Sequence, residues 1–358
     1  MKNITIRQVA LLSVMYLCSL NYLETSSRLS EVAKQHGYVS YVLSLLITLV
    51  LLWVISRIIR RFSGRNVVGA MIERYPIIGR CIAVLFMTFL LLISAGEMRA
   101  CVDFINSSLL NRTPLVVIGL IVMATVIIIA QGGIRSLVGI AEIYVPILIL
   151  AVLMIVFTTW RDADIRNLQP FLPFYWRGIF HGFWVIFSSV GQLVLFPLIL
   201  SGKHYKIKGG YTGLLVSGLY LIVFILMVQL VVGIPLSAKL MYPTYEIIRQ
   251  VQVTDFMDRF DLLLVALWLP TVFAKIGFNI YLLANLMQIT IPGVSGRLMV
   301  APMGVLSYVC GVWFFKNPVQ QINFNEQLML LSIVFEICIP LLLFFALWPR
   351  RKKRLQSG

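Results

Sequence analysis

The sequence predicts an all-α integral membrane protein with ten transmembrane helices, arranged as two inverted halves of five. Three observations lead to this prediction. Of the 358 residues, 60% are hydrophobic and only 12% are charged, which is more apolar surface than a soluble core of this size could bury. Apolar segments long enough to cross a bilayer as helices follow one another along the chain, and the alternating pattern of barrel strands is absent.

Ten apolar segments have about the 20 residues that a membrane-crossing helix needs. The polar segments between them are too short to form a second domain, so we expect one membrane domain over 1–358 that ends in a basic tail, 349–358. The predicted spans are 8–27, 38–59, 80–105, 114–131, 137–159, 178–200, 211–235, 261–288, 298–315 and 328–348.

The distribution of Lys and Arg predicts the orientation of these spans. If the N-terminus is inside, 18 of the 30 basic residues fall in inner segments and 10 in outer segments, as the positive-inside rule requires. Both termini are then cytoplasmic. The net charge of +16 reflects this topology, and we expect the basic tail to contact anionic lipid headgroups rather than nucleic acid.

Five spans precede the polar segment that follows residue 159, and five come after it. Because five is odd, the two halves must cross the membrane in opposite senses, which makes them an inverted repeat of about 7–159 and about 178–348. In membrane proteins built on this plan, the first helix of each half is broken near mid-membrane, and its freed backbone groups face a ligand.

Polar or glycine-interrupted stretches occur at corresponding places in the two halves. The first span turns polar at Ser19 and continues through Asn21 and Glu24, and the sixth span has a polar centre. We therefore predict that both helices are broken there. Each stretch alone could also be structural, since Ser can bond to helix carbonyls and small residues mark close helix packing. The central residues of the sixth span are Ser188, Ser189, Gly191 and Gln192.

Lys275 lies in the middle of the eighth span, where a charge costs about 2.5–3.5 kcal/mol. Thr271 and Asn279 share its helix face. The ammonium could take the place of a coupling cation, or exchange a proton. Alternatively, it could form a structural ion pair with one of three acids, Glu24, Glu97 or Glu336.

Other charged residues in spans are ambiguous. Glu142 and Glu336 occupy corresponding spans, each four residues before a proline, and we favour helix capping or bundling over ligand binding for both. Glu97 and Arg99 could gate a cavity or lie among lipid headgroups, and for Asp103 we favour the headgroups.

Catalytic and metal-binding patterns are missing from the sequence. It contains no Walker A loop, G-x-S-x-G, H-E-x-x-H or His/Cys cluster, and its five cysteines are scattered singly. We therefore expect neither an enzyme nor a metal site, and no cofactor.

Several motifs resemble those of the spore germination permease family, the B subunits of nutrient germinant receptors in endospore-forming bacteria. The resemblance covers essentially the whole chain. It includes G-G-I-R-S-L-V-G-I-A-E-I-Y-V-P, N-L-Q-P-F-L-P, F-S-S-V-G-Q-L-V-L-F-P-L and D-R-F-D-L-L-L-V-A-L-W-L-P-T-V-F-A-K-I-G-F-N-I-Y. The family is similar to amino acid, polyamine and organocation transporters, which implies a LeuT-like 5+5 fold with helices 1 and 6 broken.

The resemblance also implies a function and a site. The subunit would bind a nutrient in the spore inner membrane and signal through an A subunit in the membrane and a lipoprotein C subunit. It would contact the ligand through Asn21, Glu24, Ser188, Ser189 and Gly191, with Cys101 or Glu97 at the outer wall.

Three positions are informative about how far this resemblance extends. Relatives usually have Gly and Pro where this chain has Ser19 and Ser26, so the first break could be shallower or the ligand different. Relatives commonly have Glu where Gln192 stands, so a charged contact there does not carry over. The coupling or gating candidates Lys275, Glu142 and Arg99 do match.

Three functions follow from these observations. The leading one is a receptor subunit that holds a germinant, such as an amino acid, between the two helix breaks, with Glu24 favouring the amine end. A sugar or nucleoside bound by Asn21, Ser188 and Gln192 is the other ligand class. A proton- or sodium-coupled amino acid transporter of the same fold is the alternative, and a structural scaffold for the A subunit is the third.

Overall fold

The computed structural model describes residues 4–19, 21–59, 66–200, 205–250 and 260–347. Within these ranges the chain is helical, and no strand occurs. Eight helical segments are long and apolar enough to cross a membrane: Lys34–Ile59, Pro76–Leu109, Gly133–Asp162, Trp176–Ile199, Ile207–Val232, Leu264–Thr290, Gly296–Phe314 and Gln327–Ala346. They coincide with eight of the ten predicted spans, and the all-helical membrane architecture is confirmed.

The other two predicted spans correspond to shorter apolar helices. The fourth is α6, Leu115–Gln131, and the first is divided between α1, Ile6–Cys18, and α2, Asn21–Val32. Neither α1 nor α6 reaches the length that alone would mark a span. The count of ten therefore stays a prediction.

Both predicted helix breaks are present. The first helix ends at Cys18, and Ser19 has a non-helical backbone with φ −80° and ψ −98°. In the second half, α8 (Trp176–Val190) passes into a 3₁₀ turn, η5 (Gly191–Val194), before α9 (Leu195–Ile199). The tighter turn changes the direction of the helix and its hydrogen-bonding pattern at mid-span.

The broken helices lie at the centre of the molecule. Helix α1 packs against α7 (Gly133–Thr159), α10 (Ile207–Val232) and α13 (Phe260–Thr290). Residues Leu12 to Cys18 of α1 are buried, as are all residues of η5 and α9. Because α1 is buried on all sides from Leu12 onward, this part of the first span has no polar face.

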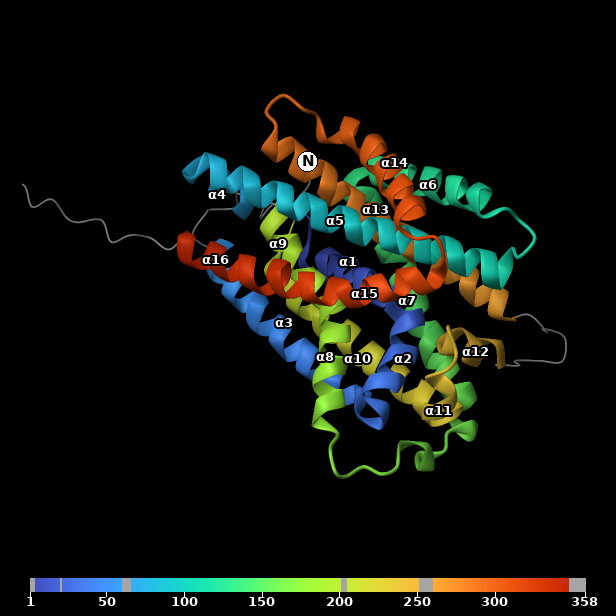
Figure 1. The fold of residues 1–358 in the computed structure, drawn as a ribbon. Coiled ribbons are helices and arrows are strands. Elements are labelled where there is room, and N and C mark those ends of the chain that lie inside the picture. The colour runs from blue at the N-terminus through green and yellow to red at the C-terminus, as the bar shows by residue number, and fades with distance from the viewer. Residues whose placement is uncertain (1–3, 20, 60–65, 201–204, 251–259, 348–358) are drawn as a thin grey trace, which may run out of the picture.

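A group of four helices packs together on one side of α1. They are α5 (Pro76–Phe104), α6, α13 and α14 (Gly296–Phe314), and each contacts the other three. In Figure 1 this group occupies the upper half of the view, while α2 and α8 lie below it. The remaining elements of eight or more residues are α3 (Gly37–Ile59), α4 (Val67–Arg74), α12 (Pro243–Gln250), α15 (Pro318–Ser332) and α16 (Ile339–Ala346).

The last span contains a π-helical segment. Helix α15 continues into η6, Ile333–Cys338, which has π-helical geometry and leads into α16. Pro340 stands near the start of α16 and has no amide hydrogen to donate to the carbonyl of Glu336, so the regular α-helical ladder cannot run through this point. π-helical segments occur frequently at functional sites.

Candidate functional site

A polar cluster joins the two helix breaks at the centre of the bundle. Its core is an ion pair between Lys275 on α13 and Glu97 on α5, with 2.8 Å between Lys275 Nζ and Glu97 Oε1. The lysine side chain is fully buried, and the Glu97 side chain is 12% exposed. Of the three acids considered from the sequence as partners of Lys275, the structure brings Glu97 to it.

Asn279, one turn along α13 from Lys275, extends the cluster. Its Nδ2 donates to Glu97 Oε2 at 2.9 Å. Both carboxylate oxygens of Glu97 are therefore engaged by α13, which is what a buried carboxylate requires. Of the three polar residues predicted to share one face of the eighth span, Lys275 and Asn279 contact Glu97. The third, Thr271, instead donates to the carbonyl of Trp268 in its own helix at 2.7 Å.

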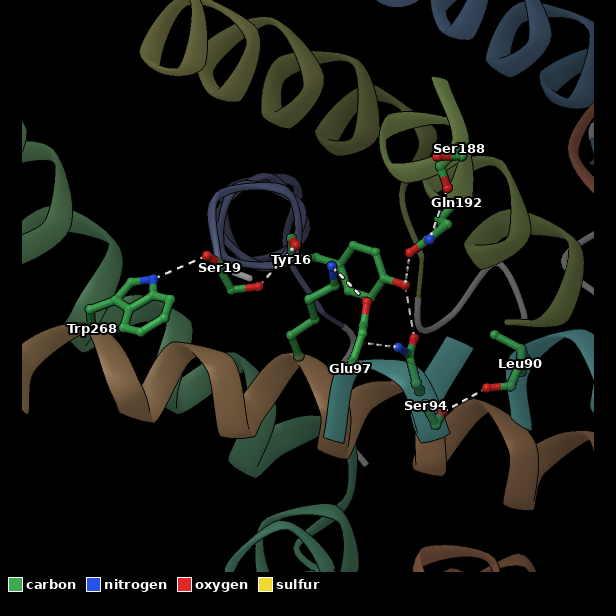
Figure 2. Close-up of polar contacts among 10 residues, drawn as sticks. Tyr16, Ser19, Leu90, Ser94, Glu97, Ser188, Gln192 and Trp268 are labelled. Atoms are coloured by element: carbon green, nitrogen blue, oxygen red, sulfur yellow. Dashed lines mark hydrogen bonds and ion pairs between the residues drawn. The ribbon is translucent and has the colours of Figure 1, made fainter. Parts of the chain in front are cut away.

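Tyr16 connects this ion pair to both broken helices. Its hydroxyl lies 2.8 Å from Asn279 Oδ1 and 2.8 Å from Gln192 Oε1, and it can donate its one proton to either oxygen. The Lys275 ammonium also lies 4.9 Å from the centre of the Tyr16 ring, within the range of a cation–π interaction. Figure 2 shows the Tyr16 ring between Glu97 and Gln192.

The residues of the second break have mostly local partners. Gln192 in η5 donates from Nε2 to the carbonyl of Ser188 at 2.9 Å, and the Ser188 hydroxyl donates to the carbonyl of Val185. Ser189 is half-buried on α8. Gly191 lies in close contact with its neighbours, because a Cβ at this position would overlap the end of the Glu336 side chain and press on Phe187.

The first break is held from α13. Trp268 Nε1 donates to the carbonyl of Ser19 at 3.0 Å, and the Ser19 hydroxyl donates to the carbonyl of Tyr16 at 3.2 Å. These bonds satisfy groups that the end of α1 leaves without a helical partner, and Figure 2 shows Trp268 reaching Ser19 from the neighbouring helix. The predicted contacts of Asn21 and Glu24 lie outside the described side chains.

The remaining predicted residues lie apart from the cluster. Arg99 is buried and donates from Nε to Asp103 Oδ2 at 2.8 Å and from Nη1 to the carbonyl of Phe315, so this pair joins α5 to the end of α14. Both side chains are buried, where we expected headgroup contact for Asp103. Cys101 is buried one turn beyond Glu97, and Glu142 is half-buried on α7.

A small open space lies at Gly96 on α5. This residue is buried in α5 next to Glu97, yet a Cβ built on it would meet no atom within 4 Å. A separate cavity of about 290 Å³ lies where the start of α7 meets the end of α13, and its lining includes Arg135, Asn285 and Arg297. That cavity does not include the residues of the two breaks.

Sequence reasoning did not single out Tyr16 or Trp268. Both count as apolar in a hydropathy profile, so neither interrupts its span. The available signal was chemical, because a buried Tyr hydroxyl or Trp indole N–H usually needs a hydrogen-bond partner, and Tyr16 stands one turn before the break.

The two breaks, the buried ion pair and the helical order define a membrane protein with the fold of LeuT-like transporters. The structure is similar to that of Mhp1, a nucleobase-cation-symport-1 family transporter, with a TM-score of 0.62 and 15% identity over 94% of this chain and 78% of the other. It is also similar to a Na⁺-coupled sialic acid symporter, with a TM-score of 0.65 and 13% identity over 92% and 77%.

The chain belongs to the spore germination protein family, which it matches over residues 3–319. YfkT of Bacillus subtilis (strain 168), which is named for spore germination, is 31% identical over 88% of this chain and 87% of its own length. Spore germination protein A2 of the same organism is 24% identical over 77% and 76%. The resemblance found in the sequence motifs is confirmed, and the protein is a non-enzymatic membrane protein of a germination family.

Proposed function

We propose that this chain is the nutrient-sensing subunit of a spore germinant receptor. It binds a small molecule, an amino acid, between the two helix breaks and signals to an A subunit and a lipoprotein C subunit of the spore inner membrane. The observation that carries the proposal is the cluster of Tyr16, Glu97, Gln192, Lys275 and Asn279. It links both breaks to α5 and α13, the elements that would surround a ligand in a protein of this fold.

The charge of the cluster supports a zwitterion as the ligand. Lys275 and Glu97 neutralise each other, so this pair adds no net charge that would select an anion or a cation. The ends of the broken helices offer partial positive and partial negative charge to the carboxylate and the ammonium group. A sugar or nucleoside, which is uncharged, would depend on the Gln192 and Ser188 groups instead.

The space at Gly96 provides the test. Gly96→Leu adds a bulky apolar side chain one residue before Glu97, at a position where the first added atom meets no other atom within 4 Å. Gly139→Leu is the matched control, because a Cβ at Gly139 on α7 also meets no atom within 4 Å and Gly139 is outside the cluster.

The experiment measures germination of spores whose only B subunit is this chain, in its native, Gly96→Leu or Gly139→Leu form. Each strain is exposed to single amino acids, sugars and nucleosides. We expect germination with amino acids in the native strain and the Gly139→Leu strain, and a response reduced at least about tenfold with Gly96→Leu. A tenfold loss equals about 1.4 kcal/mol of ligand affinity. A Gly96→Leu strain that responds normally would contradict a ligand site at this cluster and favour the scaffold function.

A coupled transporter is the second candidate, because the fold is shared with symporters. Purified chain in proteoliposomes would accumulate labelled amino acid under a proton or sodium gradient if it transports. A receptor would bind the amino acid without accumulating it, and its response in spores would depend on the A and C subunits.

A further inference from the structure

A second acid lies behind the break in the sixth span. Glu336, in the π-helical segment η6, is fully buried, and neither of its carboxyl oxygens has a hydrogen-bond partner among the described residues. An ionised carboxylate in such a place is unfavourable by far more than a hydrogen bond could offset, so a group held there takes up a proton and becomes neutral. This acid is separate from the Lys275 and Glu97 pair.

The Glu336 carboxyl group contacts the break itself. It lies so close to Gly191 that a single methyl group at position 191 would overlap its Oε2. Gly191 is followed by Gln192, which bonds to Tyr16. The 3₁₀ turn η5 is therefore held between the polar cluster on one side and the Glu336 carboxyl group on the other.

The surroundings of Glu336 favour a proton over a metal ion. Its neighbour Phe335 stacks on Phe89 at 4.4 Å between ring centres, and Phe187 lies beside Gly191. Hard cations need several oxygen ligands at once, and no group of metal-binding side chains occurs among the residues that the structure describes. The carboxyl group alone can bind a proton in such an environment.

The elements packed against η6 are α15, α16, η5 and, through Phe335, α5. Their titratable groups are concentrated on α5. Helix α16 and η5 carry none, and Glu326 of α15 lies outside the described side chains. Helix α5 carries Arg80, Cys81, Glu97, Arg99, Cys101 and Asp103.

We propose that Glu336 is a proton-binding site at the back of the helix break, and that its proton is required for η5 to pack as observed. Loss of the proton would place a negative charge against Gly191 in a dry, apolar environment. The break must then move or admit water, and the bonds of Gln192 to Tyr16 move with it. By linkage, whatever shifts the break also changes the affinity of Glu336 for its proton.

The first test is infrared spectroscopy of the purified chain in lipid nanodiscs, with isotope-labelled glutamate to identify carboxyl bands. An ordinary Glu loses its proton near about pH 4.3, so at neutral pH we expect a protonated-Glu band in the native chain that Glu336→Gln removes. Glu142→Gln is the matched control, because Glu142 is half-buried in the corresponding span, and the band should survive it. A native chain without such a band at neutral pH, or a band that survives Glu336→Gln, would overturn the proposal.

The second test asks whether the proton holds the break. Hydrogen exchange of backbone amides in 190–199, corrected for the intrinsic effect of pH, should increase above the pH at which the Glu336 band disappears. Glu336→Gln stays neutral and should show no such increase. Equal increases in both chains, or no increase in the native chain over its whole stable pH range, would contradict a role for the proton in packing η5.

A third comparison uses the contact with Gly191. Gly191→Ala should shift the Glu336 band, because the added methyl group displaces the carboxyl group, whereas Gly139→Ala should leave it unchanged. If Gly191→Ala does not fold, Glu336→Asp, which withdraws the carboxyl group from Gly191, should give a displaced protonated-carboxyl band when aspartate is isotope-labelled in place of glutamate. An unshifted band in a folded Gly191→Ala chain would refute the contact. None of these readouts needs a nutrient or a partner subunit, so they succeed or fail independently of the proposed function.

Discussion

The side chain of Lys275 is removed from solvent, so its charge depends on the protein around it. The side chain is fully buried, and a lone charge at mid-membrane costs about 2.5–3.5 kcal/mol even on the more lenient scale. Glu97 and the face of the Tyr16 ring compensate for it. The pair therefore depends on both partners, because removing one leaves the other buried without its ion-pair partner, and breaking a buried pair in this way costs about 3–5 kcal/mol.

The first prediction concerns this pair. Lys275→Ala should abolish the nutrient response, and Lys275→Arg should retain part of it, because the site needs a fixed cation. Measuring germination together with the amount of folded protein separates loss of function from loss of protein. The double change Lys275→Met with Glu97→Gln should recover most of the stability without recovering the response. A fully active alanine variant would rule out the requirement for a cation.

Tyr16 carries the second prediction. Tyr16→Phe removes the hydroxyl that bridges Gln192 and Asn279 and leaves one of those oxygens without its donor. We expect a loss of about 1–3 kcal/mol in unfolding free energy and a weaker response. Tyr308→Phe is the control, since the Tyr308 hydroxyl on α14 makes only a long 3.4 Å contact to the carbonyl of Val116 among those described. Equal effects of the two changes would argue against the bridge.

At this scale the sequence identifies residues whose polarity conflicts with their span. Lys275, Asn279 and Gln192 were found in this way, and all three lie in the cluster. Glu97 was left between two interpretations, because its partner lies 178 positions further along the chain and no local pattern indicates such a contact. Tyr16 was missed because aromatic residues are normal in membrane spans.

Among the helical elements, the first break depends on a neighbouring helix for its hydrogen bonds. The carbonyl of Ser19 has lost its helical donor and accepts from Trp268 instead. Within a bilayer, an irregular backbone is tolerated only where other groups satisfy it. The tryptophan of α13 is therefore part of what allows α1 to end at Cys18.

The third prediction tests this bond. Trp268→Phe keeps an aromatic ring and removes the indole N–H, so the Ser19 carbonyl is left unsatisfied. We expect a loss of about 1–3 kcal/mol in unfolding free energy and faster hydrogen exchange in 16–27. Trp313→Phe is the control, because Trp313 is 78% exposed on α14. If 16–27 exchanges at the native rate in the Trp268→Phe chain, the bond does not hold the break.

The sequence predicted the existence of most elements better than their ends. The first span was expected to end at 27, but α2 continues to Val32, because its later turns are amphipathic and polar rather than apolar. The third span, predicted to begin at 80, begins earlier in the structure, because Pro76 starts α5. Neither π-helical segment, η2 (Ile105–Leu109) or η6, was predicted, because such segments arise from a shift in backbone pairing that side-chain patterns do not record, although Pro340 lies close to η6.

At the scale of the whole molecule, counting spans predicts an arrangement into two halves but does not predict the identity of the ligand. The two helix breaks lie where the predicted halves begin, as an inverted repeat would require. The solved structures with this fold bind chemically different molecules. Ligand choice therefore depends on a few side chains between the breaks, which fold class cannot specify.

The fourth prediction concerns the orientation of the chain in the membrane. With both termini cytoplasmic, a cysteine introduced at Asn111 should react with an impermeant thiol reagent added outside, and one at Ser295 only after the membrane is opened. Both residues are exposed in loops, and the five native cysteines must first be replaced because Cys81 and Cys338 are also exposed. The opposite labelling pattern would invert the topology.

The placement of the ion pair determines which bonds a rearrangement would have to break. Lys275 and Glu97 belong to α13 and α5, two members of the four-helix group that pack against each other. Tyr16 and Gln192, on the broken helices, reach that pair through neutral hydrogen bonds that run to Asn279 and through the face of the Tyr16 ring. If the broken helices slide against the four-helix group, bonds worth about 0.5–1.5 kcal/mol each are exchanged, while the charges stay paired throughout. The Lys275–Glu97 ion pair would thus stay intact inside the four-helix group, and only the weaker hydrogen bonds between this group and the broken helices would be exchanged.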